Sequence, residues 1–502
     1  MTEVYGTIAG RHMSYDSESD EESAIGSRRS AELNDIVLLP ISKESPNRST
    51  TKQALSDPIP SSFLEQENAI LHFRDRFRGK GREKVGILES IKAIALSSWL
   101  NILLVNIPIA WVSHFLEWHP SITFSLCFLS MVPLERLFEY GGEQMAFYCG
   151  QSLGELVSIT LNNVVEATLA VILLQKCELK LLQSTIVGVV LLHLLLVPGA
   201  TFLTGGARIK HQKLESARVQ LNHTLLTVGV MALLLPAAFF SALTPTTPTA
   251  VSSSSSEAAA IQGASAVNQV HILAMSRGMA IMLLIIYICS RVFFHRPPGR
   301  KNVLSDDPEA SEEFTRKEHE LRISEPEVNP WVCLAFLVVT VGIMAATAEW
   351  LVDSIDFVME SAKLTEEWFG LILLPIVSFS ADGAIAIGHY IKVLYTYVRY
   401  KMPIPPSPLA KSKTIDLSIQ FTLFWMPFLV LMGWWTGKPM SLLFDFYDVV
   451  SLIGACFLVN YVTADSKTNW VEGLILLSFY VMIGLCTWFY EGQADLDSLL
   501  VC

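Results

Sequence analysis

Charged residues are scarce in this chain of 502 residues. Only 17% of the residues are Asp, Glu, Lys or Arg, whereas 51% are hydrophobic, and the mean hydropathy is +0.42. A soluble protein of this length needs more charge to cover its surface. The apolar residues are also gathered in runs of about twenty, the length of a membrane-spanning helix. The composition therefore excludes an ordinary cytosolic enzyme and predicts a polytopic membrane protein.

Cysteine motifs, a basic recognition face and a leader segment are absent as well. No spacing among the eight cysteines predicts a zinc site, a CxxC redox pair or a disulfide framework, so we expect most of them to be small core or lipid-facing side chains. No basic face with a reader motif predicts a nucleic-acid partner. No apolar run after Met1 predicts a cleavable signal peptide. Nothing in the sequence predicts a cofactor.

Hydropathy and length predict an all-α polytopic membrane protein with about eleven transmembrane helices. These spans lie near 92–115, 121–138, 151–175, 181–204, 223–243, 270–294, 330–353, 368–391, 415–436, 441–463 and 470–490. A charged loop separates the first six from the last five. We interpret them as one leading helix and two five-helix repeats. Because five is odd, the repeats enter the membrane from opposite sides and are inverted.

This interpretation divides the chain into six parts. They are a disordered cytosolic tail that ends in a basic cluster (1–88), the leading helix (89–116), the first repeat (117–295), an acidic cytosolic loop (296–329), the second repeat (330–492) and a lumenal tail (493–502). Lys and Arg are concentrated in the loops on the side of the basic cluster. The positive-inside rule therefore predicts a cytosolic N-terminus and a lumenal or external C-terminus.

Two acids lie near the middle of predicted spans. Glu166 lies in the third span, with Asn162 and Asn163 on the same helical face, and Asp382 lies in the eighth span with Ser378 four residues before it. An acid at mid-membrane costs about 2.5–3.5 kcal/mol on insertion scales, so it normally faces a cavity or pathway. Spans three and eight are equivalent in the two repeats. The pattern predicts an ion site at the membrane midplane.

Carboxylate, amide and hydroxyl oxygens are the ligands that calcium prefers. Two nearby buried carboxylates could hold either a divalent cation or protons, and this competition is a mechanism for exchange. The alternative is that each acid stays protonated and forms an interhelical hydrogen bond.

Further polar residues are candidates for the site or for a proton pathway. Gln183 and Gln420 lie early in the fourth and ninth spans, as oxygen donors or as interhelical links. His193, in the apolar run GVVLLHLLLVPG, is a proton relay or a packing residue. Glu143 lines a cytosolic vestibule or lies in headgroup water.

Several long segments resemble the cation/proton exchanger family of the calcium/cation antiporter superfamily, in particular its fungal and plant vacuolar calcium/proton antiporters. The resemblance covers about residues 97–492 and is carried by GQSLGELVSITLNNVVEATLAVILL (150–174) and LVNYVTADSKTNWVEGLILLSFYVMIGL (458–485), among others. It implies eleven spans, two inverted repeats and midplane acids that bind calcium. It also implies proton-coupled calcium export from the cytosol, a vacuolar membrane with its lipid, and no enzymatic activity.

The family signature Gly-Asn-Ala-x-Glu falls on residues 162–166, where Asn163 and Glu166 are kept and Asn162 replaces the glycine. In the second repeat it falls on residues 378–382, where Phe379 replaces the amide and Asp382 replaces the glutamate. Gln420 matches the family's glutamine, whereas His193 replaces an asparagine. Fewer oxygen donors leave the transported cation open, with manganese, sodium or potassium exchange as alternatives, along with a regulatory paralogue without transport. Homo-oligomerisation is also left open.

Overall fold

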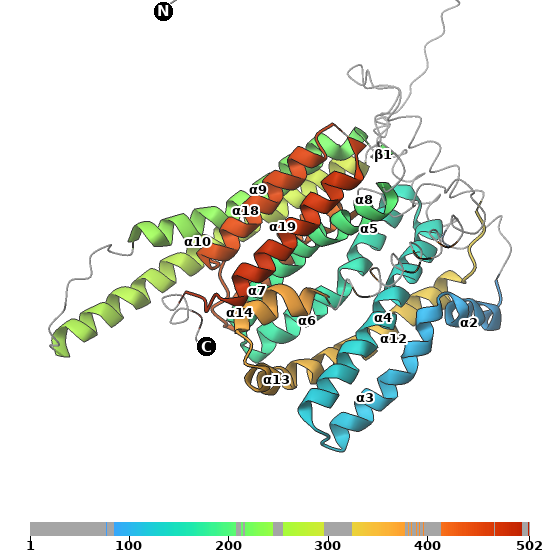
Figure 1. Cartoon of the computed structure of the whole chain (residues 1–502), viewed down its shortest axis with the longest axis horizontal. Helices are drawn as coiled ribbons and strands as arrows, with labels where there is room; N and C mark the ends of the chain where they lie inside the picture. The colour runs from blue at the N-terminus through green and yellow to red at the C-terminus, as the bar shows by residue number, and fades with distance from the viewer. Residues whose placement is uncertain are drawn as a thin grey trace, which may run out of the picture. The chain divides into compact units, whose positions relative to one another are not determined.

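The protein is described here by a computed structural model. It describes Phe77 and residues 85–206, 212–213, 216–243, 255–295, 324–376, 380, 383, 388, 391, 395, 413–465, 467–493, 500 and 502. Helices make up most of this part of the chain (Figure 1). The predicted all-α class is confirmed.

The helices follow the predicted spans closely. In the first half they are α2 (Ile87–Leu96), η1 (Trp99–Val105), α3 (Asn106–Phe115), α4 (Pro120–Cys149), α5 (Gln151–Asn162), α6 (Val164–Lys176), α7 (Leu179–Leu191), η2 (Leu192–Leu196), α8 (Val197–Gly206), α9 (Ser216–Leu243) and α10 (Ser255–His295). In the second half they are α12 (Pro330–Asp353), α13 (Ile355–Ala362), α14 (Glu366–Trp368), η3 (Phe369–Leu373), α16 (Lys413–Gln420), η4 (Phe421–Trp425), α17 (Met426–Thr436), α18 (Phe446–Val462) and α19 (Trp470–Trp488).

In the described residues, seven helices are long and apolar enough to cross a membrane, or up to nine if each of two bent pairs is one span. The shorter apolar helix α18 matches the predicted tenth span. The outer surfaces of these helices are apolar: Phe457 and Tyr461 on α18 and Leu485 on α19 are 72%, 76% and 61% exposed. Large exposed apolar side chains of this kind belong in contact with lipid.

Two predicted segments differ from the structure. The second span does not stop at 138 but continues as α4 to Cys149, because Arg136 pairs with Glu139 along the same helix and the charge does not end it. The leading span is not one helix: its two parts bend by 95° between α2 and η1. The amide of Asn101 donates to the carbonyls of Ile94 and Ala95 and so satisfies the last turn of α2.

Irregular turns recur at related places in the two halves. The fourth span contains a π-helical turn at Leu192–Leu196, and the ninth contains one at Phe421–Trp425. A third lies in the eighth span at Phe369–Leu373, while the third span is broken by 52° between α5 and α6. Such π-turns widen a helix locally and are frequent at functional sites. Their positions fit the prediction of two equivalent repeats.

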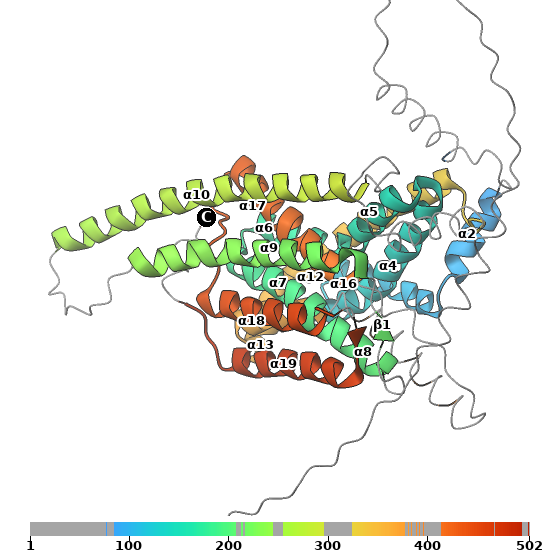
Figure 2. The ribbon, with the colours of Figure 1, turned by 90° about the horizontal axis from the view of Figure 1, so that it is seen from above.

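Glycines allow the fourth and eighth spans to touch. A Cβ atom at Gly188 would lie 2.3 Å from the Leu371 carbonyl oxygen, and one at Gly370 would lie 2.8 Å from the Ser184 Cβ. Small residues at a helix crossing are how membrane helices approach closely. The contact brings the beginning of the eighth span against α7. Figure 2 shows α9 and α10 lying along the helices α18 and α17 of the second half.

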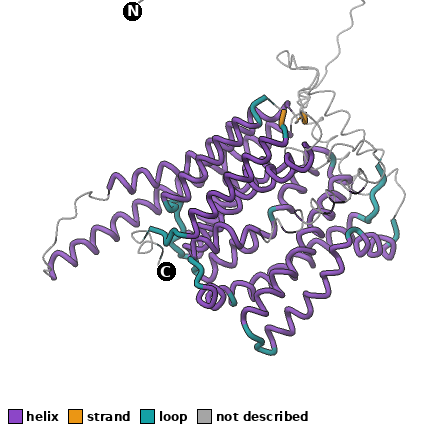
Figure 3. Tube along the Cα trace, viewed as in Figure 1, coloured by secondary structure: helices purple, strands orange, loops and turns teal. Residues whose placement is uncertain are grey.

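The two ends of the helical bundle are tied differently. At one end, β1 (Gln212–Lys213) pairs antiparallel with β2 (Lys467–Thr468), a short sheet visible in Figure 3. At the other end, Cys177, just after α6, forms a disulfide with Cys502. The cysteine spacing predicted no disulfide framework, and this one pair escaped the sequence analysis because its partners are 325 positions apart, which no local spacing can reveal. We call the end of the bundle that contains Cys177 and Cys502 the disulfide end.

Candidate cation site

A helix break places polar groups in the middle of the third span. α5 ends at Asn162 and α6 begins at Val164, and Asn163 between them has φ −97° and ψ 5°. The axis bends by 52° here, and the Asn163 N–H donates back to the carbonyls of Thr160 and Leu161. Broken helices of this kind supply carbonyl oxygens to cations in secondary transporters.

Glu166 lies in the first turn of α6 and is 3% exposed. The Nε2 atom of His193, from the π-turn η2, lies 3.9 Å from Oε1 of Glu166. His193 is also buried, and its Nδ1 atom has no hydrogen-bond partner in the described part of the chain. A π-turn contains one more residue than an α-helical turn and so rotates the fourth span locally. Glu166, the predicted metal ligand, and His193, the predicted proton relay, therefore meet here.

Asn163, at the helix break three residues before Glu166, presents a buried oxygen atom. Its amide nitrogen donates to Oε1 of Gln420 at 2.8 Å and to the Leu417 carbonyl at 3.3 Å. The side chain is fully buried, and its Oδ1 atom has no hydrogen-bond partner among the described residues. A buried oxygen without a donor, three residues before a buried carboxylate, suits a hard cation.

Gln420 holds this amide in place. Its Nε2 atom donates to Thr160 Oγ1 at 2.8 Å and to the Tyr287 hydroxyl at 3.0 Å, while its oxygen accepts from Asn163. All its strong hydrogen-bonding groups are therefore used within the protein. The sequence left two roles open for Gln420, an oxygen donor or an interhelical link, and its hydrogen bonds correspond to the second, in which Gln420 orients Asn163.

The sequence did not single out Thr160 and Tyr287, which complete this network. Thr160 lies one turn before Asn163 on α5, so the helical period that grouped Asn162 with Glu166 could have included it. Tyr287 comes from α10, and nothing in the sequence pairs it with Gln420 across 133 residues.

Other predicted residues lie elsewhere or outside the described part. Gln183 donates to the carbonyls of Ser441 and Leu443, and it is ten residues from His193, roughly 15 Å along a helix. It therefore joins α7 to the segment before α18, a structural role. Glu143 is exposed on α4, and Asn162 is half-buried. Asp382 and Ser378 fall outside the described residues.

Glu166 is the acid of this cluster. Among the described residues, no group of three or more His, Cys, Asp and Glu side chains is arranged to hold a metal ion. The candidate ligands in the described residues are thus one carboxylate, one amide oxygen and an imidazole. Such a set can exchange protons with a cation on Glu166, because a proton and a cation compete for the same carboxylate.

Known proteins resemble this chain over most of its length. The family model described as "Sodium/calcium exchanger protein" matches residues 332–489. A vacuolar calcium ion transporter of Cryptococcus neoformans is 31% identical, covering 89% of this chain and 82% of the relative. A vacuolar calcium ion transporter of Schizosaccharomyces pombe is 30% identical, covering 81% and 88%. A Ca²⁺/H⁺ antiporter of Aphanothece halophytica is 30% identical, covering 77% and 95%.

A solved structure, that of native YfkE, shares the fold. It superposes with a TM-score of 0.56 at 20% identity and covers 78% of this chain and 100% of its own. At that identity the likeness concerns the helical architecture alone. The sequence relatives, aligned over four fifths of their length or more, carry the family assignment. The chain belongs to the cation/proton exchanger family of the calcium/cation antiporter superfamily.

Proposed function

We propose that this protein is a secondary active antiporter that moves calcium out of the cytosol into an acidic organelle, the vacuole or its equivalent, in exchange for protons. Its relatives include proteins named as vacuolar calcium ion transporters and as a Ca²⁺/H⁺ antiporter. The protein acts by transport across the membrane, and its substrates are ions rather than molecules that it converts.

The contact between Glu166 and His193 at the helix break carries this proposal. Both side chains are buried between spans three and four, and the Asn163 oxygen at the same helix break has no hydrogen-bond partner among the described residues. A calcium ion on Glu166 and Asn163 would oppose a proton on the carboxylate or on the imidazole, because like charges in a low-dielectric cavity repel strongly. Loading with protons therefore favours release of calcium, and loading with calcium favours release of protons.

The proposed orientation places the disulfide end in the lumen and the N-terminus in the cytosol. The Cys177–Cys502 disulfide supports it, since disulfides persist in secretory and extracellular compartments and are rare in the cytosol. The loops predicted on the opposite side are those rich in Lys and Arg. Calcium would then enter from the end where α16 begins.

The experiment is proton-driven calcium uptake into sealed vesicles that contain the purified protein and an acidic interior. We expect uptake of radiolabelled calcium by the wild type, abolished by Glu166→Gln, which keeps the size of the side chain but cannot ionise. Glu360→Gln, at an exposed position on α13, is the control. Competition by manganese and sodium measures which cation the site prefers. Uptake by Glu166→Gln at the wild-type rate would refute the role of this carboxylate.

A further inference from the structure

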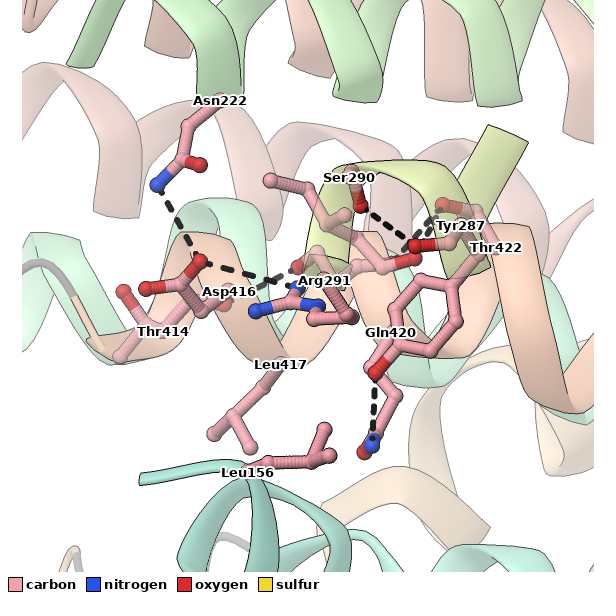
Figure 4. Close-up of polar contacts among 12 residues, drawn as sticks. Leu156, Asn222, Tyr287, Ser290, Arg291, Thr414, Asp416, Leu417, Gln420 and Thr422 are labelled. Atoms are coloured by element: carbon pink, nitrogen blue, oxygen red, sulfur yellow. Dashed lines mark hydrogen bonds and ion pairs between the residues drawn. The ribbon is translucent and has the colours of Figure 1, made fainter. Parts of the chain in front are cut away.

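A second buried charge pair lies close to the network around Gln420. The Nη2 atom of Arg291, on α10, is 4.0 Å from Oδ1 of Asp416, on α16, and their side chains are 14% and 7% exposed (Figure 4). Charged side chains with so little exposure in a membrane protein often serve an ion pathway or a partner. The pair is separate from the Glu166–His193 contact, and nothing in the sequence analysis marked it.

Three helices meet at this pair. Asn222, from α9, donates its amide to Oδ1 of Asp416 at 3.2 Å. The guanidinium carbon of Arg291 lies 4.8 Å from the centre of the Tyr287 ring and 5.7 Å from that of Phe294. Cation–π contact therefore holds Arg291 against its own helix while Asp416 faces α9 and α10 together.

The pair lies next to the candidate cation site. Asp416 precedes Gln420 by four residues on α16, about 6 Å along the helix axis. Tyr287 contacts Arg291 with its ring, and its hydroxyl accepts a hydrogen bond from the Gln420 amide. Since α16 begins at Lys413, Asp416 lies between the start of that helix and the polar network. Asp416 is therefore nearer than Gln420 to the end from which calcium is proposed to enter.

The contact is loose for a buried ion pair. At 4.0 Å it is too long for a hydrogen bond, and the Nε and Nη2 atoms of Arg291 have no hydrogen-bond partner in the described part of the structure. The desolvation cost of a buried ion pair can exceed its Coulomb gain when the geometry is poor. By contrast, the disulfide end is held by a covalent bond and by the Lys176–Asp353 ion pair.

We propose that Arg291 is a tethered counter-cation for Asp416, and that their contact closes the passage to Gln420 until an entering divalent cation takes the place of the guanidinium on Asp416. This inference rests on the proposed antiport and adds a control point to it. Arg291 acts through Asp416 and does not touch the transported ion. Asp416 is then a transient ligand on the way to Glu166.

The two partners have opposite effects on the transported cation. Without the positive charge of Arg291, the passage is open more often and Asp416 is available, so the apparent affinity for calcium rises. Without the negative charge of Asp416, Arg291 is left uncompensated beside the passage and repels the cation. A pair that only stabilised the helices would behave differently, because loss of either partner would lower the amount of folded protein and leave the KM for calcium unchanged.

The test measures the KM and the maximal rate of calcium uptake in the same vesicles. We expect Arg291→Gln to lower the KM and Asp416→Asn to raise it, each by about fivefold, and the double variant to fall between them. Arg291→Lys, which keeps the charge, should stay near the wild type. Arg277→Gln is the matched control, since Arg277 is also on α10 and also packs on an aromatic ring, at 4.9 Å from the Trp434 centroid.

The outcomes separate the two proposals. Wild-type vesicles that take up no cation would refute the antiport itself. Wild-type uptake with a KM that both single variants leave unchanged, or shift in the same direction, would overturn the role of the pair. If Arg291→Gln fails to insert into the membrane, the comparison of Arg291→Lys with Asp416→Asn still decides, because only the second should raise the KM.

Discussion

The imidazole of His193 faces the carboxylate of Glu166 at 3.9 Å, across the contact between the third and fourth spans. His193 thus places a group that can bind a proton beside a buried carboxylate. A protonated imidazole at this distance opposes a cation on the carboxylate, whereas a neutral imidazole does not. We therefore expect His193 to couple the proton to the proposed calcium site.

His193→Asn should weaken this coupling. An amide supplies an oxygen ligand and takes up no proton, so we expect the KM for calcium to fall roughly tenfold, and uptake to depend less on the acidity of the lumen. Calcium uptake at a series of internal pH values measures both effects. An unchanged pH profile would show that His193 packs against Glu166 without exchanging protons.

Asn163→Leu should remove transport at a modest cost in stability. The substitution deletes the buried oxygen and leaves the Gln420 oxygen without its donor, which costs about 1–3 kcal/mol. Gln183→Leu is the matched control, because that buried amide also donates two hydrogen bonds, to Ser441 and Leu443, away from the site. We expect both variants to melt earlier and only Asn163→Leu to lose calcium uptake. Loss of uptake in the Gln183 variant would place that residue in the pathway after all.

Much of the fold could be predicted from the sequence because the membrane leaves few alternatives. Backbone groups in lipid must be hydrogen-bonded internally, so apolar runs of sufficient length become helices. Glu166 and Asn163 became site candidates for the same reason, because polar side chains are costly in a span unless they serve a site.

What the sequence could not reveal depends on contacts between distant segments. The π-turn that brings His193 to Glu166 leaves no pattern in the hydropathy of GVVLLHLLLVPG. The pairing of Arg291 with Asp416 joins residues 125 positions apart, each of which reads alone as a charge at the end of a span. These contacts depend on how side chains pack between helices, and the periodicity of one helix carries no information about that packing.

Removal of the disulfide should destabilise the protein without abolishing transport. Cys177→Ser frees the C-terminal residue from the corner between α6 and α7, and a native disulfide typically contributes about 2–4 kcal/mol. We expect a lower melting temperature in detergent and a calcium KM close to that of the wild type. Cys486→Ser, an exposed free cysteine on α19, is the control. Peptide mapping without reductant must recover the linked pair, and two free thiols there would contradict the assignment.

Glu178 should make the disulfide end more stable in acid. Burial, with the nearby Asp356 carboxylate, raises the pKa of Glu178 above its ordinary value of 4.5, and Lys176 opposes the shift. A carboxyl group whose pKa is higher in the folded state than in the unfolded state binds its proton more tightly when folded. Its contribution to stability is therefore complete below the ordinary pKa and is lost as the pH rises through the folded value.

Thermal melts of the wild type and of Glu178→Gln between pH 4 and pH 7 would measure this effect, with Glu360→Gln on α13 as the surface control. We expect Glu178→Gln to be the more stable of the two proteins at neutral pH, and the difference to shrink toward pH 4, where the native carboxyl is protonated. A difference that grows in acid would mean that Glu178 is held as an anion, with the Lys176 ammonium rather than burial as the dominant influence. An acidic lumen is proposed to face the disulfide end. If acid stabilises this end as predicted, the end is more stable at the pH of the lumen than at neutral pH.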